Sequence, residues 1–388
     1  MSDKKTVCLC MIVKDEEKDI ERCLNSVKDH IDYWVISDTG SSDNTIDKIN
    51  SLMSEYGIEG ELHEHKWVDF ATNRNNVIEL ARDKADYLWM MDADDYYIEK
   101  EGVGLLDGIP EDEELFRLNF YKSGAFKREA LMKASADINY HGVFHEFLWF
   151  NDFDFSRQNR IKTIENGNII ANSSPTKRAE TAEKKYLQDA KILEKALKKE
   201  SREVMIQRYT FYIAQSYENA KKYGLAIKWY KKRLDGFQSK IETYMSLFGI
   251  VKCNINLNPL ASNDIISSIV DCWKQYPNRL EPIHVVVRHF LLLGDPYIAF
   301  MIADGPSKTA AHVKGDTLFR SDVYMLKFPI LHALAAYMIE KKDIALLILN
   351  ALLLKFKEED EGYRQIIQSY IQKIENDLVS REDVLCLA

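Results

Sequence analysis

The chain has 388 residues, more than one hydrophobic core usually serves, so two or three domains are expected. Hydrophobic residues make up 46% and charged residues 29%, which is typical of a soluble globular protein. The formal net charge of -9 gives no general electrostatic reason to bind nucleic acid or anionic lipid. We therefore expect no nucleic-acid partner.

The cysteines argue against a zinc site or a disulfide framework, and the apolar stretches argue against a signal peptide or a membrane span. The six cysteines are scattered, and none has the spacing of a zinc site or of a disulfide framework. The opening stretch MSDKKTVCLCMIV is too short in its apolar part to be a signal peptide. Of the two best membrane candidates, 283–303 is broken by charged residues and a proline, and 344–354 is too short. We therefore expect no transmembrane segment and a location in a reducing cytoplasm.

Strand and helix patterns alternate up to about residue 95. Strands are predicted over 6–13, 33–37, 61–64 and 87–91, and helices over 19–27, 44–56 and 71–84. Repeated βα units favour an α/β fold, with a mostly parallel sheet and helices on both faces. Residues 114–170 are aromatic and rich in β-forming residues, so they are expected to complete the same domain with mixed strands and loops.

The rest of the chain is predicted to be helical. Turn and capping residues at 172–180 precede it, so we divide the chain into an α/β domain over 1–172 and an all-α domain over 173–388. The stretch RYTFYIAQSYENAKKYGLAIKWYKKRLD has the small and aromatic residues of a tetratricopeptide helix pair centred on Ala226. A second pair is predicted around Ala299, and the alternative is a generic helical bundle.

Polar residues follow three of the predicted strands, where ligands of an open parallel sheet bind. KDEEKD follows the first strand, DTGSSD the second and DADD the last. Helix starts and caps account for most of the first two stretches, but they leave Asp38 without a structural role. Asp92 and Asp94 fall on one side of the backbone, which suits a hard divalent cation that is also held by phosphate oxygens. The alternative is a solvated acidic loop.

These stretches, together with WVDFATNRNNVIELA, resemble the nucleotide-sugar domain of family 2 glycosyltransferases in order and in approximate spacing. The resemblance covers about residues 1–170 and implies the Rossmann-like GT-A fold. With the tetratricopeptide-like helices that follow, the chain is also similar to a bacterial-type subgroup that includes peptide S-glycosyltransferases.

The resemblance implies a role for each matching residue. Asp94 and His145 would ligate Mn2+ or Mg2+, and Glu146, or else Asp95, would be the catalytic base. Arg74 would face the diphosphate and Asp92 the ribose or the metal. The residues implied in nucleotide-sugar binding are Val13, Lys14, Glu16, Asp38, Arg74, Asp92 and Ala93. Many relatives have two adjacent acids where this chain has Asp38-Thr39, so the resemblance implies less about how the base of the nucleotide is recognised. For His145 and Glu146 the alternative is a structural histidine and a surface glutamate.

The function implied is a metal-dependent glycosyltransferase. It would move a hexose or N-acetylhexosamine from a nucleoside diphosphate sugar, expected to be a UDP-sugar, to a hydroxyl or thiol of a protein, peptide or glycan acceptor, with inversion. One alternative is a non-catalytic sugar-nucleotide-binding protein whose helices bind a peptide or protein partner. Another is a nucleotidyltransferase, which would want a glycine- and lysine-rich phosphate loop where this chain is acidic. The helical domain is expected to recognise the acceptor, to form a homodimer or to cover the catalytic domain.

Overall fold

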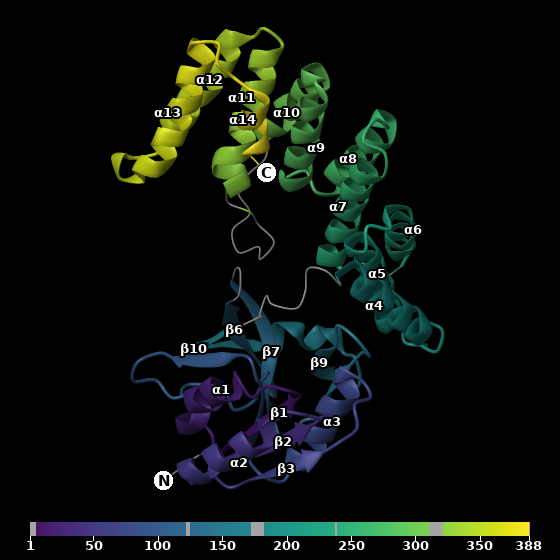
Figure 1. Ribbon diagram of the computed structural model, residues 1–388, viewed down its shortest axis with the longest axis vertical. Helices are drawn as coiled ribbons and strands as arrows, with labels where there is room; N and C mark the ends of the chain where they lie inside the picture. The colour runs from purple at the N-terminus through teal and green to yellow at the C-terminus, as the bar shows by residue number, and fades with distance from the viewer. Residues whose placement is uncertain are drawn as a thin grey trace. The chain divides into compact units, whose positions relative to one another are not determined.

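A computed structural model describes residues 5–121, 125–171, 182–236, 239–309, 320 and 322–387 of the chain (Figure 1). These residues fall in two compact units, 1–181 and 182–388. The domain boundary predicted between 172 and 173 lies outside the described residues. The two units are described separately.

The first unit is built on an eight-stranded sheet with the order β3-β2-β1-β4-β7-β6-β10-β5. The half from β3 to β4 is parallel throughout, and β7 joins β4 in the antiparallel direction. The strands of this sheet are β1 (Val7–Val13), β2 (Tyr33–Asp38), β3 (Gly60–Glu64), β4 (Tyr87–Met90), β5 (Tyr96–Glu99), β6 (Leu115–Tyr121), β7 (Ala125–Lys133) and β10 (Lys162–Ile170). A separate hairpin pairs β8 (Ile138–His141) with β9 (Phe147–Phe150). The α/β, mostly parallel fold predicted from the sequence is confirmed.

Helices cover both faces of the parallel half of the sheet. Along β1, Leu9 and Met11 belong to a buried cluster with residues of α1 (Ile20–Val27) and α2 (Thr45–Tyr56). The alternate residues Cys8 and Cys10 belong to a second cluster with residues of α3 (Phe70–Ala81). Burial on both faces explains why β1 is an unbroken apolar run instead of an alternating one.

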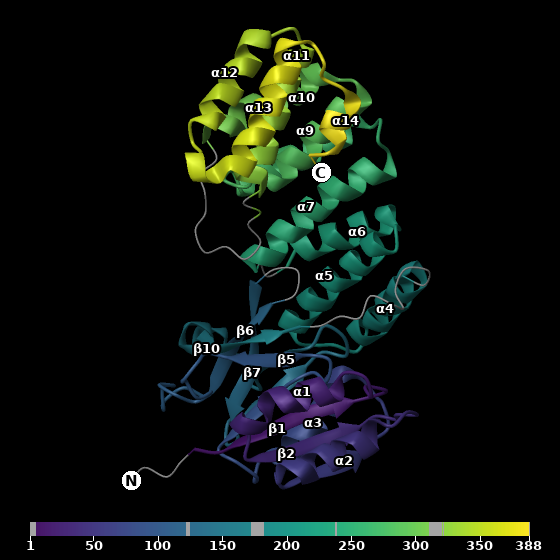
Figure 2. The same ribbon diagram turned by 60° about the vertical axis from the view of Figure 1, so that its left-hand side comes forward.

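The second unit is helical; from α4 to α13 each helix packs against the next one along the chain, and α14 packs against α9 (Figure 2). One large buried cluster runs through its later helices. The helices of this unit are α4 (Ala182–Leu197), α5 (Glu203–Asn219), α6 (Tyr223–Leu234), α7 (Lys240–Leu257), α8 (Ser262–Gln275), α9 (Glu281–Leu293), α10 (Pro296–Thr309), α11 (Phe328–Met338), α12 (Lys342–Leu353), α13 (Glu361–Glu375) and α14 (Arg381–Leu385). A five-residue π-helical segment, Val323–Lys327, leads into α11.

Both predicted helix pairs are present. In the pair α5–α6, Ala226 and Tyr230 are buried, and the Tyr230 hydroxyl donates to Glu218 over 2.6 Å. In the pair α9–α10, Ala299 is fully buried. Gly294, at a φ of 81°, ends α9 and divides the apolar stretch 283–303 into two helices. No helix in the described parts of the chain is long and apolar enough to cross a membrane.

Candidate active site

The polar stretches identified in the sequence meet at the carboxyl edge of the parallel strands. Val13 at the end of β1 is paired with Asp38 at the end of β2, and β4 lies on the other side of β1. The loops after these strands enclose a cavity of about 510 Å³, a size common for small-molecule sites. Its lining residues are Ile12, Val13, Lys14, Glu16, Thr39, Trp67, Phe70, Arg74, Asp92, Ala93 and Asp94. Seven residues predicted for the site are therefore brought together.

The loop after β1 is fastened to the loop after β2. The Asp15 carboxylate accepts hydrogen bonds from the backbone N–H and the hydroxyl of Ser42, at 2.7 and 3.0 Å. The Glu16 backbone N–H donates to the Thr45 hydroxyl over 2.8 Å. Asp15 itself has a φ of 54°, in the left-handed region. These contacts fix the backbone around Glu16 and leave its side chain to line the cavity.

Asp38 has the structural role that the sequence did not suggest. Its Oδ2 accepts hydrogen bonds from the backbone N–H groups of Gly40 and Ser41, at 2.8 and 2.9 Å, and the Ser41 hydroxyl donates to Oδ1. The side chain is buried and does not line the cavity. Asp38 therefore shapes the turn after β2, and its contact with the base or ribose stays a prediction.

Arg74 is the central cation of the site. It lies on α3, is buried, and its Nη2 donates to Asp92 Oδ1 over 2.6 Å. A second guanidinium nitrogen, Nη1, donates to the Glu146 carboxylate. The rings of Phe70 and Tyr140 lie 5.5 and 5.0 Å from the guanidinium carbon, so aromatic faces complete its surroundings.

A second arginine, Arg128, contacts the other oxygen of the same carboxylate. It lies on β7, and its Nη1 donates to Asp92 Oδ2 over 3.2 Å. Burial alone would raise the pKa of Asp92, but the two guanidinium groups outweigh burial and hold that pKa well below its usual range. Asp92 is thus an ionised bridge between Arg74 and Arg128. No local sequence signal marks Arg128, because only the pairing of β7 with β4 places it here.

Each of the two arginines has one buried donor that no described group uses. The Nε–H of Arg74 and the Nε–H of Arg128 are buried and have no hydrogen-bond partner among the described residues. An unpaired buried donor costs free energy unless something binds to it. A guanidinium fork suits the oxygens of a phosphate or diphosphate in particular. The site therefore fits an anionic ligand next to Asp92.

Glu16 and Asp94 also line the cavity, and their carboxylates fit a cation shared with that anion. Burial, followed by the charges of Asp94 and other nearby carboxylates, raises the pKa of Glu16 to about 7. A bound divalent cation would relieve this repulsion. The described residues include no group of three or more His, Cys, Asp or Glu placed to hold a metal ion. Two carboxylates with phosphate oxygens are nevertheless a usual set for Mg²⁺, so Asp94 and Glu16 suit a cation that arrives with the nucleotide.

Three other predicted residues lie outside the lining of the cavity. Glu146, between β8 and β9, contacts the site through its ion pair with Arg74. Asp95 is buried, and its backbone N–H donates to the Asp92 carbonyl over 3.1 Å. His145 has a φ of 55° and its ring stacks edge-on against Phe144. The proposed roles of these three residues stay predictions.

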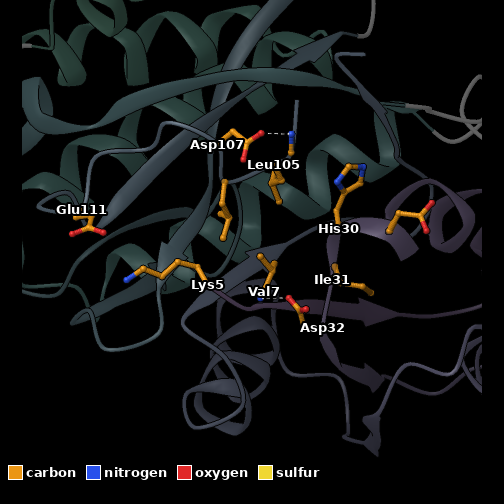
Figure 3. Close-up of a pocket in the computed structure, with 11 residues that line it drawn as sticks. Lys5, Val7, His30, Ile31, Asp32, Leu105, Asp107 and Glu111 are labelled. Atoms are coloured by element: carbon orange, nitrogen blue, oxygen red, sulfur yellow. Dashed lines mark hydrogen bonds between the residues drawn. The ribbon is translucent and has the colours of Figure 1, made fainter. Parts of the chain in front are cut away.

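A second cavity of the same unit, about 350 Å³, lies at the opposite, amino end of β1 (Figure 3). It is lined by several acids, but two of them serve the local backbone. Asp32 accepts from the Val7 N–H over 3.0 Å, and Asp107 accepts from the Gly104 N–H over 2.7 Å. The arginine-bearing cavity at the carboxyl edge is therefore the better candidate for a catalytic site.

Comparison with known proteins finds relatives of part of the chain. The chain is 30% identical over 155 residues to the SPbeta prophage-derived glycosyltransferase SunS of Bacillus subtilis, covering 37% of this chain and 35% of that protein. It is 37% identical over 109 residues to a TPR repeat-containing protein of Synechococcus elongatus, covering 28% of this chain and 25% of that protein. These matches span about a third of the first curated relative and a quarter of the second.

A likeness among solved structures is to S. aureus TarS 1-349 in complex with UDP-GlcNAc. It has a TM-score of 0.33 and 12% sequence identity, and it covers 70% of this chain and 89% of that one. The family model described as Glycosyl transferase family 2 matches residues 8–174, which include every residue of the cavity. Through this match, residues 8–174 of the chain are similar to glycosyl transferase family 2.

Proposed function

We propose that the chain transfers a hexose or N-acetylhexosamine from a nucleoside diphosphate sugar to an acceptor hydroxyl or thiol, with inversion. A UDP-sugar is the donor to test first. The observation that carries the proposal is the buried Arg74, which has an unpaired Nε–H, in one cavity with the carboxylates of Asp94 and Glu16. This arrangement suits a diphosphate together with a divalent cation. The match of residues 8–174 to a glycosyltransferase family supports it.

The chain's own residues would bind and stabilise the leaving group. Arg74 and Arg128 place two permanent positive charges beside the position proposed for the diphosphate, where negative charge grows as the sugar leaves. Asp94 and Glu16 would hold Mn2+ or Mg2+, which when bound would neutralise part of that same charge. Val13, Lys14 and Ala93 line the cavity and would contact the nucleotide sugar.

In the transfer step, the acceptor oxygen or sulfur forms a bond to the anomeric carbon while the bond from that carbon to the diphosphate breaks. The acceptor proton passes to a carboxylate. We propose Glu146 as this base, with Asp95 as the second choice. Glu146 is held by Arg74, so a diphosphate that binds Arg74 competes for the same guanidinium and leaves Glu146 less restrained.

We further propose that the helical unit recognises a protein or peptide acceptor. Successively packed helices offer an extended surface, and one relative of the chain is a TPR repeat-containing protein. Self-association of this unit as a homodimer and a cytoplasmic location stay predictions.

The test is to incubate the chain with a panel of nucleoside diphosphate sugars, with and without Mn²⁺, and to identify the products. Free nucleoside diphosphate is expected from one donor. Asp94→Ala should lose the Mn²⁺-dependent part of donor binding, and Glu146→Gln should lose transfer while keeping donor binding. Pyrophosphate as the product would point to a nucleotidyltransferase instead. Binding without any product, with acceptor peptides present, would favour a non-catalytic sugar-nucleotide-binding protein.

A further inference from the structure

Trp67 is an exposed aromatic side chain at the edge of the cavity. It follows β3, it lines the cavity together with Thr39, and 45% of its surface is exposed. Its neighbour Phe70 packs edge-on against it, with ring centroids 4.8 Å apart, and leaves one face of the indole without an aromatic neighbour among the described residues.

The backbone that carries Trp67 is held on both sides by one buried amide. The Asn73 side chain is fully buried; its Nδ2 donates to the Lys66 carbonyl over 3.1 Å, and its Oδ1 accepts from the Val68 N–H over 2.9 Å. Asp69 caps the start of α3 by accepting from the Thr72 N–H over 2.7 Å. Trp67 is thus an exposed ring on a fixed backbone, which lowers the entropy cost of binding to it.

The order of the strands places Trp67 at one end of the cavity and the acids at the other. Trp67 follows β3, Thr39 follows β2, Lys14 follows β1, and Asp94 follows β4, in the order in which these strands lie in the sheet. Three steps of about 4.8 Å separate the outer two strands, or about 14 Å. This is about the reach of a nucleoside diphosphate from its base to its terminal phosphate. If the diphosphate lies at Arg74 and Asp94, the base lies at Trp67.

We propose that Trp67 is the platform on which the base of the donor nucleotide stacks. This inference rests on the proposed function and adds a specificity-determining residue to the same site. Stacking selects any planar base over a bare phosphate, because every base presents a π face. Stacking therefore supplies affinity for the nucleoside although this chain has Thr39, and not a second acid, next to Asp38.

The experiment is a calorimetric titration of UDP, GDP and inorganic pyrophosphate, each with Mn²⁺, against the full chain and three variants. Trp67→Ala should weaken UDP binding about 5- to 150-fold and leave pyrophosphate binding unchanged. Trp67→Phe keeps an aromatic face and should recover most of the affinity. Val68→Ala, at the exposed neighbouring position, is the matched control and should bind UDP as the wild type does.

Tryptophan fluorescence gives a second readout. The chain has six tryptophans, and UDP should quench part of the emission of the wild type. In Trp67→Phe that part should be absent although UDP still binds. Equal UDP affinity in the wild type and Trp67→Ala would overturn the inference, and so would an equal loss of pyrophosphate binding. If UDP binds through Trp67 but no sugar is ever transferred, the proposed function fails and the stacking role stands.

Discussion

Asp92 and Arg128 are 36 positions apart in the sequence, but Asp92 Oδ2 lies 3.2 Å from Arg128 Nη1, where β7 runs beside β4. Arg74 takes the second oxygen of the same carboxylate at 2.6 Å. Because both oxygens are occupied by guanidinium groups, Asp92 orients Arg74, which lines the cavity, and Arg128 behind it. This differs from the direct metal or ribose contact predicted from the sequence, which stays untested.

Arg128→Met should destabilise the first unit and weaken donor binding. The substitution removes a charge-assisted hydrogen bond from a partly buried carboxylate, a loss of about 1–3 kcal/mol in the free energy of unfolding. It also removes one positive charge near the position proposed for the diphosphate, so we expect nucleoside diphosphate affinity to fall about tenfold. Chemical denaturation and calorimetric titration measure the two effects.

The matched control is Arg117→Met on the neighbouring strand. Arg117 pairs with Glu129 over 2.8 Å, and both side chains are about one fifth exposed, away from the lining of the cavity. Arg117→Met should lower the free energy of unfolding by less than about 1 kcal/mol and leave nucleotide binding unchanged. Equal losses of affinity in the two variants would show that Arg128 acts only through the stability of the sheet.

How far the sequence predicts this site depends on whether its residues are set by local or by long-range structure. Asp92, Asp94 and Glu16 each follow a strand whose apolar run is visible in the sequence, so their place at the carboxyl edge is predictable. Arg128 is not, because its strand reaches β4 only through an antiparallel pairing that no local pattern specifies.

Asp38 is a residue whose role could not be predicted even though it lies in a local turn. The residues of its turn, DTGSS, are all visible in the sequence, and Gly40 and Ser41 are typical turn residues. Their presence does not reveal which acceptor their backbone N–H groups use. The structure gives that acceptor as the Asp38 carboxylate, and this turn role could not be predicted from the sequence. The contact of Asp38 with a ligand stays a prediction.

The turn role of Asp38 predicts a graded loss of stability. Asp38→Ala removes the acceptor of two backbone N–H groups and should lower the free energy of unfolding of the first unit by about 1–3 kcal/mol. Ser41→Ala removes only the hydroxyl contact and should cost less. Thermal denaturation of both variants provides the measurement. If Asp38→Ala unfolds like the wild type but loses nucleotide binding, the carboxylate acts on the ligand and not on the turn.

The raised pKa of Glu16 predicts that the stability of the ligand-free chain depends on pH. Its pKa in the fold is raised to about 7 from an ordinary value of 4.5, so between these pH values the folded protein holds a proton that the unfolded chain releases. The contribution of Glu16 to stability therefore falls as pH rises from about 4.5 to 7. Glu16→Gln removes this cost, and its melting temperature in EDTA should exceed that of the wild type increasingly from pH 5 to pH 8.

The control for net charge is Glu17→Gln, which removes one negative charge from the same loop. If the difference in melting temperature between Glu16→Gln and the wild type stays constant from pH 5 to pH 8, Glu16 does not hold its proton in the fold. Saturating Mn²⁺ with nucleoside diphosphate should reduce the same difference, because a cation beside Asp94 favours the ionised form of Glu16.

Close packing between α6 and α7 predicts that Gly249→Ala destabilises the helical unit. A Cβ atom at Gly249 would lie 2.4 Å from the ring of Tyr230, which is buried and fixed through its hydroxyl to Glu218. Overpacking of this kind costs about 1–3 kcal/mol in the free energy of unfolding. Gly224, near the start of α6, has open space around its Cβ position, so Gly224→Ala should leave stability unchanged or raise it by up to about 1 kcal/mol. Denaturation of the two variants should therefore show a clear loss in the free energy of unfolding for Gly249→Ala and none for Gly224→Ala. The reason is that one methyl group enters a filled contact and the other only favours the helix. A loss of stability in both variants would mean that helix propensity and not the contact with Tyr230 decides the outcome.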